Sequence, residues 1–270
     1  MIGLTYGNFS SSGAGFDPDA QAFITAAGIT GETQQSALNQ LVLDLKGTGS
    51  TTNNTDVWSD LHAVYPMCPI DGSTATRDAY KWNLKDPRDL DAAFRITWFN
   101  DPTASINGIS GNGTSQYGNT HLNFLSVLSE DNVSISETTD SLNNISMGLT
   151  NGQTFFQINQ VFSNIWAYNG KNDPVRSSFL ANTSHVAISN RTSDISHKLF
   201  INGINSGEIT SSLNSIIGLD CYILCRNLNG SPNTFSSSTY KFFTIGNGLT
   251  NNQAKDLYDS ISTYNSALGR

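Results

Sequence analysis

The sequence predicts a mainly β fold, in which a two-layer sandwich has helices on its N-terminal side and one helix at its C-terminal end. From Lys81 onward, short apolar and aromatic runs alternate with Asn- and Gly-rich turns, and their lengths and spacing suit a sandwich. Only 13% of the residues are charged, against about 25% in an average soluble domain, and Ser, Thr, Asn and Gly take their place. Such short polar side chains bond to their own backbone and favour turns.

The bulk properties exclude several classes of protein. With 37% hydrophobic and 10% aromatic residues, the 270-residue chain has enough apolar material for one large β domain. The net charge of −8, without any Lys/Arg cluster, argues against binding of nucleic acid. No apolar run approaches the ~18 residues of a membrane span. The N-terminus lacks the order of a signal peptide, so we expect the protein to be made in a cytosol.

Residues 1–16 are rich in Gly and Ser and carry a few large apolar side chains. Free in solution, such a segment is poorly ordered, and its aromatic residues are useful only when they dock onto something. One interpretation is a frayed terminus, and the other is an extended arm that binds a neighbouring subunit. The partner-binding residues of this arm would be Leu4, Tyr6, Phe9 and Phe16.

Three helices are predicted between residues 17 and 65. The first, 17–28, has Asp17 as its cap, Pro18 in its first turn and Gly28 at its end. The second spans 31–47 and has one apolar stripe. A short third helix is expected over 56–65, stopped by Pro66, with its inward side chains at Trp58, Leu61, His62 and Tyr65. The predicted organisation is therefore an arm (1–16), a helical attachment region (17–67) and a sandwich (68–270).

The strands follow from Lys81. The clearest hairpin has Asn202-Gly203 between two apolar runs, because a tight hairpin turn requires positive φ angles. An amphipathic helix over 249–268, capped by Thr250 or Asn251, closes the sandwich. The predicted strands are 94–99, 118–127, 133–138, 145–149, 154–158, 165–168, 184–191, 198–202, 204–210, 220–226 and 240–246.

Cysteine and histidine offer no metal or disulfide signature. Cys221 and Cys225 are expected on one face of one strand, roughly 13 Å apart, which is too far for a bridge or a shared zinc ion. With Cys68 they are predicted to be buried thiols. No histidine has a second ligand at metal-binding spacing, so packing roles are expected. The histidines are His62, His121, His185 and His197. No catalytic residue, metal or cofactor is predicted.

The charge-dense stretch 85–91 allows three interpretations. Asp86, Asp89 and Asp91 could form internal pairs with nearby arginines within a turn. They could ligate calcium through oxygen. They could also supply the paired carboxylates of glycoside hydrolysis. The turn with internal ion pairs is the favoured interpretation.

Some aromatic residues are candidates for stacking on a sugar ring, although most aromatic side chains simply fill core volume. The Gly-rich loop 107–113 lies between strands, so it is no phosphate loop, but it could form one wall of a sugar site. The candidate platforms are Trp98, Tyr117, Trp166 and Tyr168.

Three C-terminal stretches resemble concanavalin A-like, laminin-G-type jelly rolls, the family of lectin and glucanase sandwiches. They are SHKLFINGINSGE, CYILCRNLNGSPNTFS and YKFFTIGNGLTNNQAKDLYDSISTYNSAL, and the match covers about 182–270. The resemblance implies a concanavalin A-like jelly-roll β-sandwich. Members often bind calcium or sugars, but none of their ligand positions transfers to this chain. The acid pattern of the glucanases is absent.

The N-terminal half is similar to a segment that precedes this jelly roll in bacteriophage virion proteins. The matching stretches are FDPDAQAFITAAGITGETQQSALNQLVLDLKG, YPM and YKWNLKDPRDLDAAFRITW. This implies a non-enzymatic virion structural protein, such as a fibre, an appendage or a decoration component, made in the host bacterial cytoplasm and anchored by its arm. Its partners would be other virion proteins, further copies of itself and possibly a host glycan. The alternatives are a carbohydrate-binding module for host surface glycans and, less favoured, a glycan-cleaving enzyme.

Overall fold

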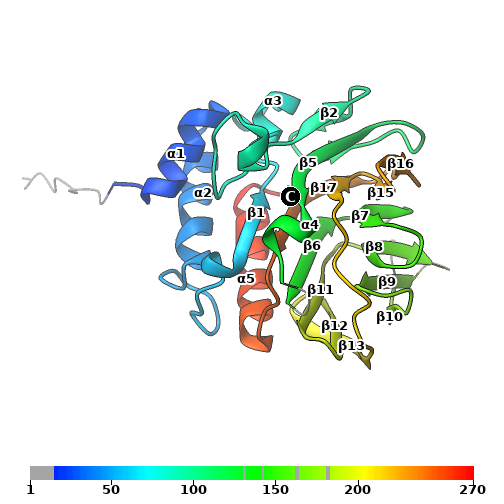
Figure 1. Cartoon of the computed structure of the whole chain (residues 1–270). Coiled ribbons are helices and arrows are strands. Elements are labelled where there is room, and N and C mark those ends of the chain that lie inside the picture. Colours follow the sequence, from blue (N-terminus) through cyan, green and yellow to red (C-terminus); the bar gives the residue numbers. More distant parts are fainter. Residues whose placement is uncertain (1–14, 130–131, 142, 162–163, 181–182) are drawn as a thin grey trace, which may run out of the picture.

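The computed structural model describes residues 15–129, 132–141, 143–161, 164–180 and 183–270. Two mostly antiparallel sheets form a sandwich, and a layer of helices covers one outer face of it (Figure 1). The predicted fold class is therefore confirmed: the chain is mainly β, with helices on the N-terminal side and at the C-terminal end.

One sheet has eight strands in the order β13-β12-β11-β6-β17-β4-β3, and β1 also pairs with β17. Its strands are β1 (Leu61–Tyr65), β3 (Thr103–Ser105), β4 (Gly108–Ser110), β6 (Val133–Thr139), β11 (His185–Ser193), β12 (Ser196–Ile201), β13 (Ile204–Thr210) and β17 (Thr239–Gly246).

The other sheet has nine strands, with the order β10-β9-β8-β7-β14-β5-β2; β15 also pairs with β7, and β16 pairs with β15. Its strands are β2 (Thr97–Phe99), β5 (Tyr117–Asn123), β7 (Ile145–Thr150), β8 (Phe155–Val161), β9 (Asn164–Asn169), β10 (Val175–Leu180), β14 (Asp220–Ile223), β15 (Arg226–Leu228) and β16 (Ser231–Asn233).

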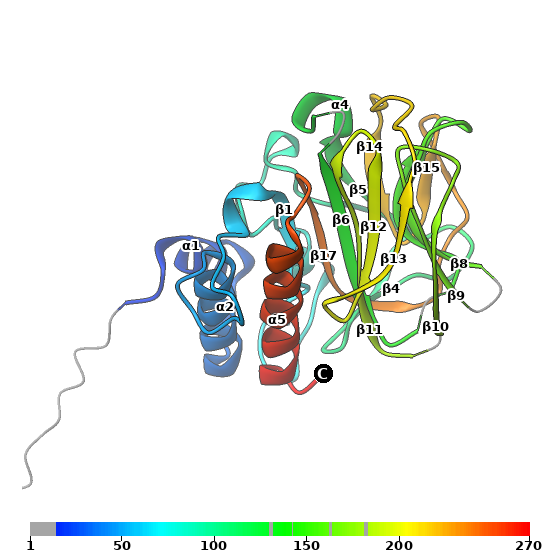
Figure 2. The same cartoon turned by 90° about the horizontal axis from the view of Figure 1, so that it is seen from below.

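The helices are α1 (Pro18–Ala27), α2 (Glu32–Leu45), α3 (Arg77–Tyr80), α4 (Phe124–Val127) and α5 (Asn251–Ala267). Figure 2 shows α1, α2 and α5 on the side of the eight-stranded sheet, away from β8, β9 and β10. One apolar cluster fills the space between the sheets, and a second lies between the eight-stranded sheet and these helices. The outer face of the nine-stranded sheet is turned away from the helical layer.

The capping residues predicted for the first and the last helix are confirmed. The Asp17 side chain accepts a hydrogen bond from the Asp19 backbone at 3.0 Å, and Gly28 ends α1 at a φ of 66°. Thr250 and Gln253 form a reciprocal capping box at the start of α5.

The predicted helix over 56–65 is wrong. Only Trp58–Asp60 form a single 3₁₀ turn, and the next residues form β1, which pairs with β17. Ala63 and Tyr65 face the core between the sheets, whereas Val64 faces the helical layer. A segment that is apolar on both faces fits either period, so pairing with β17 decides its structure.

Two predicted strands end earlier than expected. The strand over 118–127 stops at Asn123, and the next four residues form α4. The strand over 220–226 breaks at Leu224, which has a φ of 64°. Cys221 and Cys225 therefore do not share one straight strand, although both thiols are buried and free, as is that of Cys68.

The tight hairpin is confirmed. Asn202 and Gly203 have φ angles of 50° and 74°, and they join β12 to β13.

Candidate functional site

The pairing of strands shows which residues lie on the outward face of the nine-stranded sheet. Tyr222 on β14 pairs with Gly148 on β7, Gly148 pairs with Gln157 on β8, and Gln157 pairs with Tyr168 on β9. Paired residues share one face of a sheet, and their chain neighbours, such as Met147 and Ile158, lie in the core. These four positions therefore face away from the core.

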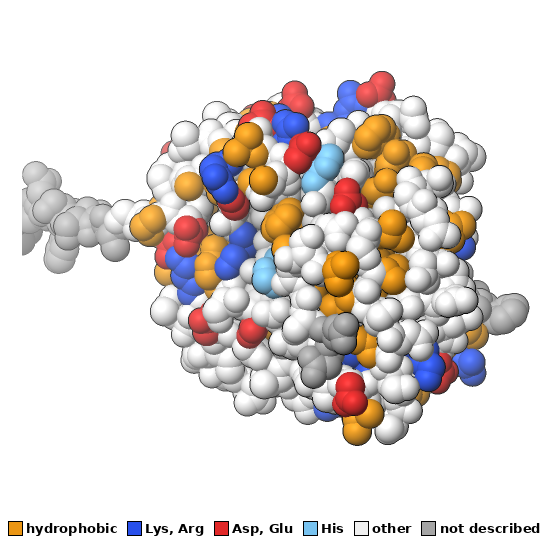
Figure 3. All heavy atoms as spheres, in the orientation of Figure 1, with side chains coloured by type: hydrophobic (Ala, Val, Ile, Leu, Met, Phe, Trp, Pro, Cys, Tyr) orange, Lys and Arg blue, Asp and Glu red, His pale blue; other side chains and the backbone are white. Residues whose placement is uncertain are grey.

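Aromatic rings gather at one end of this face. Phe99 stacks on Tyr117 with ring centroids 4.6 Å apart and planes 5° apart, and Tyr117 lies 5.1 Å from Tyr222. The ring of Phe235 meets Tyr117 edge-on at 6.3 Å. We call Phe99, Tyr117 and Tyr222 the aromatic row. Figure 3 shows hydrophobic side chains gathered on the surface over the β2–β5 end of the molecule.

The aromatic row combines exposed ring surface with protonated phenols. Phe99 is 38% exposed, although it is a large apolar side chain. Burial raises the pKa of Tyr117 and of Tyr222, and nearby Cys225 acts in the same direction. Both phenols therefore remain able to donate and accept hydrogen bonds at neutral pH.

A second aromatic group lies at the other end of the same face. Phe155 and Tyr168 have ring centroids 5.6 Å apart, and the guanidinium of Arg176 lies 4.5 Å from the ring centre of Trp166. Arg176 and Trp166 are register partners on β10 and β9. Between the two groups, β7 carries Gly148 and Thr150 on this face, and the neighbouring Gln157 of β8 is only 2% exposed.

Polar side chains accompany the aromatic row. The amide groups of Asn119 and Asn123 donate to the carboxylate of Asp220 at 3.3 and 3.4 Å. The Thr97 hydroxyl lies 2.8 Å from Nε2 of His121. An exposed ring next to amide, hydroxyl and carboxylate groups can bind a polyhydroxylated ligand by combining stacking with hydrogen bonds.

The structure brings three of the four predicted platform residues to this face: Tyr117, Trp166 and Tyr168. Trp98 is the exception. It is partly buried and packs against the edge of the core between the sheets, and its indole Nε1 donates to the Arg77 carbonyl of α3 at 3.0 Å. Phe99 and Tyr222 were not among the platform residues predicted from the sequence. Alternation within a strand could have found Phe99, because Trp98 and Phe99 are adjacent and point to opposite faces.

Within the predicted loop 107–113, residues 108–110 form β4. The carboxamide oxygen of Asn112 accepts backbone hydrogen bonds from Thr114, Ser115 and Gln116 at 2.9–3.2 Å and so holds the turn that follows. This Asn side chain is used to shape its own turn.

The acidic cluster 85–91 is an ion-paired turn, as favoured from the sequence. Asp86 pairs with Arg88, and the hydrogen bond from that guanidinium lowers the pKa of the carboxyl group. Asp89 pairs with Lys81 and Arg95, and Asp91 also pairs with Arg95. Across the described residues, no group of three or more His, Cys, Asp or Glu side chains is placed to hold a metal ion.

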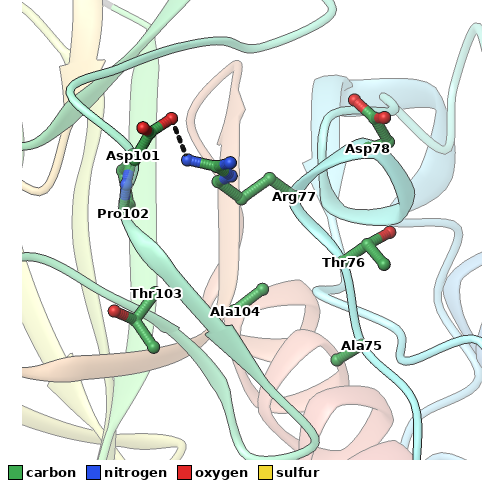
Figure 4. A pocket seen from close by; sticks show the side chains of 8 residues that line it. All are labelled: Ala75, Thr76, Arg77, Asp78, Asp101, Pro102, Thr103 and Ala104. Atoms are coloured by element: carbon green, nitrogen blue, oxygen red, sulfur yellow. Dashed lines mark hydrogen bonds and ion pairs between the residues drawn. The ribbon is translucent and has the colours of Figure 1, made fainter.

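Figure 4 shows a separate hollow of about 470 Å³ between the start of α3 and the segment that leads into β3. Arg77 reaches from one wall of this hollow to Asp101 on the other, and the two form an ion pair. Arg77 and Asp101 satisfy each other's charge across the hollow, and the carboxylate of Asp78 lines the same hollow.

The histidines make packing contacts. His62 lies 3.3 Å from the Asn247 side-chain oxygen, and Nε2 of His197 lies 3.1 Å from the Ser189 hydroxyl. His185 forms a fully buried pair with Glu137, with 2.9 Å between Nε2 and Oε1.

Of the predicted arm residues, Leu4, Tyr6 and Phe9 lie outside the described residues. Phe16 is partly buried and packs against the apolar cluster of the helical layer. None of the described helices is long and apolar enough to cross a membrane.

No protein-family model matches the chain, and no curated protein matches it. Among solved structures, it is similar to domain 4 of an extracellular arabinanase from Geobacillus stearothermophilus, with 15% identity over 60% of this chain and 80% of that one and a TM-score of 0.40. It is also similar to the CBM40 of a Ruminococcus gnavus sialidase bound to α2,3 sialyllactose, with 14% identity, 47% and 80% coverage and a TM-score of 0.36.

A sialidase from Trypanosoma rangeli matches 83% of this chain and 38% of its own, with 10% identity and a TM-score of 0.49. With such low TM-scores and identities of at most 15%, these three similarities support no conclusion about the function. The class of the protein is therefore defined by its own architecture: it is a two-sheet β-sandwich with a layer of helices on one face.

Proposed function

We propose that this protein binds carbohydrate through the outward face of its nine-stranded sheet and does not cleave it. The observation that supports the proposal is the aromatic row, in which an exposed ring is stacked on a tyrosine beside amide and carboxylate groups. The C–H faces of a pyranose pack against such rings, and the sugar hydroxyls bond to the neighbouring polar groups.

The small number of carboxylate groups in the strands of this sheet favours binding without cleavage. In the nine strands of the sheet, Asp220 is the one Asp or Glu residue. Hydrolysis by the usual mechanism needs two carboxyl groups across the scissile bond, about 5–10 Å apart. Asp220 is also occupied by Asn119 and Asn123, which suits positioning of a ligand.

A glycan array probed with the full chain and with matched variants tests the proposal. Phe99→Ala removes the most exposed ring of the row, and Ile204→Ala, at a 68% exposed position of the eight-stranded sheet, is the control. We expect the wild type and the control to retain the same glycans and the Phe99 variant to lose at least about tenfold in affinity. Equal binding by all three proteins would refute the site, and no retention of any glycan by the wild type would refute the function.

A second candidate function is a structural role in a bacteriophage virion, with the protein located in the particle and anchored through residues 1–16. It rests on the similarity of residues 16–47, and of the two stretches that follow them, to segments of bacteriophage virion proteins. The placement of α1 on the opposite side of the molecule from β8, β9 and β10 is compatible with this role (Figure 2). Deletion of residues 1–16 should prevent incorporation into particles, and unchanged incorporation would refute the anchoring role.

A further inference from the structure

We infer that a hollow between α5 and the eight-stranded sheet binds a small oxyanion, held by the ammonium group of Lys241 and by the hydroxyl groups around it. The oxyanion is either a tetrahedral group, such as sulfate or phosphate, or a planar carboxylate. The hollow lies on the helical side of the sandwich, away from the aromatic row, so this site is independent of the proposed carbohydrate binding.

The hollow has a volume of about 200 Å³ and is lined from several elements. Thr138 of β6 and Lys241 of β17 line it from the sheet, Asn202 lines it from the turn between β12 and β13, and α5 lines it from the helical layer. Pockets for drug-sized ligands measure about 300–1,000 Å³, and one water molecule takes about 30 Å³ of the liquid. The hollow therefore suits a ligand of a few non-hydrogen atoms.

Thr138 supplies a buried hydroxyl group without a partner. Its register partners, Phe242 of β17 and Val186 of β11, belong to the apolar cluster under the helices, so the Thr138 side chain also faces α5. Thr138 is 5% exposed, and its Oγ1 makes no hydrogen bond with any described residue. An unpaired buried hydroxyl is unfavourable, so a further group is expected beside it.

Lys241 is brought to the hollow by an irregularity in β17. Tyr240 and Phe242 are opposite two consecutive residues of β6, so Lys241 between them is an extra residue, as in a β-bulge. The Lys241 side chain is only 7% exposed, and its Nζ lies 2.5 Å from Oδ1 of Asp140. No other described residue accepts a hydrogen bond from Nζ. Two of the three ammonium protons are thus left for a ligand.

Helix α5 contributes hydroxyl groups from one of its sides. Tyr258, Ser262 and Ser266 are spaced by four residues, so their side chains form one row, and all three residues line the hollow. Hydroxyl groups can donate hydrogen bonds to an oxyanion, and they rotate to suit its shape. The ammonium group can add charge-assisted hydrogen bonds, which are stronger than neutral ones.

The residues that line the hollow favour an anion over a cation. Among the described residues no Asp or Glu lines it, whereas Lys241 and Arg270 do. The five N–H groups of Arg270 already donate to the Asn265 side chain and to four backbone carbonyl groups. Arg270 therefore adds positive charge to the hollow, but no free donor.

Two carboxylates lie close to the hollow without lining it. Asp140 is 60% exposed, so water weakens its pair with Lys241, and Ser184 donates to the same carboxylate oxygen at 3.1 Å. Glu137 is turned to the core between the sheets, where it pairs with His185. An oxyanion in the hollow would therefore compete with a single solvent-exposed carboxylate for the ammonium group.

The competing explanation is that water alone fills the hollow and that Lys241 serves only to pair with Asp140. Under that explanation, oxyanions would act on the protein only through ionic strength, and their effect would not saturate. Binding must therefore be measured as a saturable effect at constant ionic strength.

The test titrates the full chain with sulfate, phosphate and acetate at constant ionic strength and follows the backbone amide signals by NMR. For at least one anion we expect saturable shifts at Thr138, at Lys241 and in the C-terminal half of α5. Lys241→Met should weaken this binding about tenfold or more. The matched control is Lys171→Met, which removes an exposed lysine between β9 and β10 and should leave the binding unchanged.

Two further variants test the site without removal of its ammonium group. Ser262→Ala removes one hydroxyl group of α5 and should weaken binding about threefold. Asp140→Asn removes the carboxylate that competes for Lys241, and it should tighten binding about two- to fivefold. Thermal unfolding verifies that each variant is folded.

The oxyanion site would be overturned by the absence of a saturable shift with all three anions. It would also be overturned by binding that is unchanged in both Lys241→Met and Ser262→Ala, and the Thr138 hydroxyl would then bond to water alone. Preference for acetate identifies a planar carboxylate as the ligand, and preference for sulfate or phosphate identifies a tetrahedral group. None of these residues lies in the nine-stranded sheet, so the glycan array tests the carbohydrate proposal separately.

Discussion

Arg191 of β11 donates from Nε to the backbone carbonyl of Asn169 on β9 at 2.9 Å, which joins the two sheets through the interior. The Asn169 side chain returns a hydrogen bond to the Val133 carbonyl on β6 at 3.0 Å. Nη1 of Arg191 also donates to the carbonyl groups of Asp194 and Ser211 at 2.9 and 2.8 Å. Arg191 is fully buried. Backbone carbonyls thus take the place of a counter-ion for this guanidinium.

Arg191→Ala should therefore destabilise the protein strongly. Removal of the guanidinium leaves several buried carbonyl groups without donors, and we expect a loss of about 3 kcal/mol or more in the free energy of unfolding. Urea denaturation measures this loss. Arg88→Ala, which breaks an exposed ion pair, should change stability by less than about 1 kcal/mol. Similar effects of the two substitutions would contradict the role of Arg191.

Asp256 of α5 holds the loop that follows α2. Its carboxylate accepts from the backbone N–H groups of Asn53 and Thr55, both at 2.8 Å, and from the Thr55 hydroxyl at 2.6 Å. These hydrogen bonds lower the pKa of Asp256, although burial opposes them. Asp256→Ala should reduce stability by about 2–3 kcal/mol in urea denaturation. Asp86→Ala at the surface serves as the control, and a loss no greater than its own would contradict the prediction.

His197 should make the protein less stable in acid. Burial lowers its pKa to about 3, and the Arg191 charge acts in the same direction. The folded pKa is below the unfolded value of 6.5, so the unfolded state takes up the proton first as the pH falls. The stability is complete above pH 6.5 and declines below it by about 1.4 kcal/mol per pH unit.

The variant His197→Gln should lack this part of the pH dependence, whereas His62→Gln should retain it. Unfolding free energies measured from pH 7 down to pH 4.5 give the slopes. Identical slopes for the wild type and His197→Gln would show that His197 is protonated in the folded protein.

The buried pair of His185 and Glu137 should have the opposite dependence. The two ring nitrogens of His185 face acceptors, the Thr183 carbonyl at 2.7 Å and Oε1 of Glu137 at 2.9 Å, as an imidazolium would. Burial lowers the pKa of His185, but the Glu137 charge and hydrogen bonds outweigh it, so the pKa is raised above 6.5. This stabilisation is complete below pH 6.5 and is lost as the pH rises through the folded pKa.

Glu137→Gln tests the pair through the dependence of the free energy of unfolding on pH, rather than through the free energy at one pH. Between pH 6.5 and 9 the wild type should lose the part of its free energy of unfolding that depends on protonated His185, and the variant should not show this loss. A variant with the same pH profile as the wild type over this range would contradict an imidazolium at His185.

The elements with strong local signals were predictable from the sequence. The closing helix has a cap and an apolar stripe, and the turn at Asn202-Gly203 requires left-handed backbone that this pair adopts readily. Residues 61–65 were not predictable, because their structure depends on pairing with β17 across a long stretch of sequence. Short strands such as β3 and β4 likewise depend on partners rather than on local pattern.

The proposed binding face was predictable only in part. Tyr117, Trp166 and Tyr168 could be proposed as platforms from residue type alone, but which side of the sheet they occupy depends on register. Trp98 shows the difficulty, since a shift of one residue moves a side chain from the surface to the core.

Helices α2 and α5 cover the eight-stranded sheet, so the two outer faces of the sandwich differ: the back is the helical side, and the front is the nine-stranded sheet. If the back is fastened to a larger body through the N-terminal side, every copy presents its open sheet in the same direction. Individually weak sites then act together on a glycan-coated surface, and shared attachment can raise the overall strength of adhesion by about 10²–10⁴-fold without any new contact. The helices would then do more than complete a core, since by occupying one face they leave a single direction in which the proposed sugar-binding face can point.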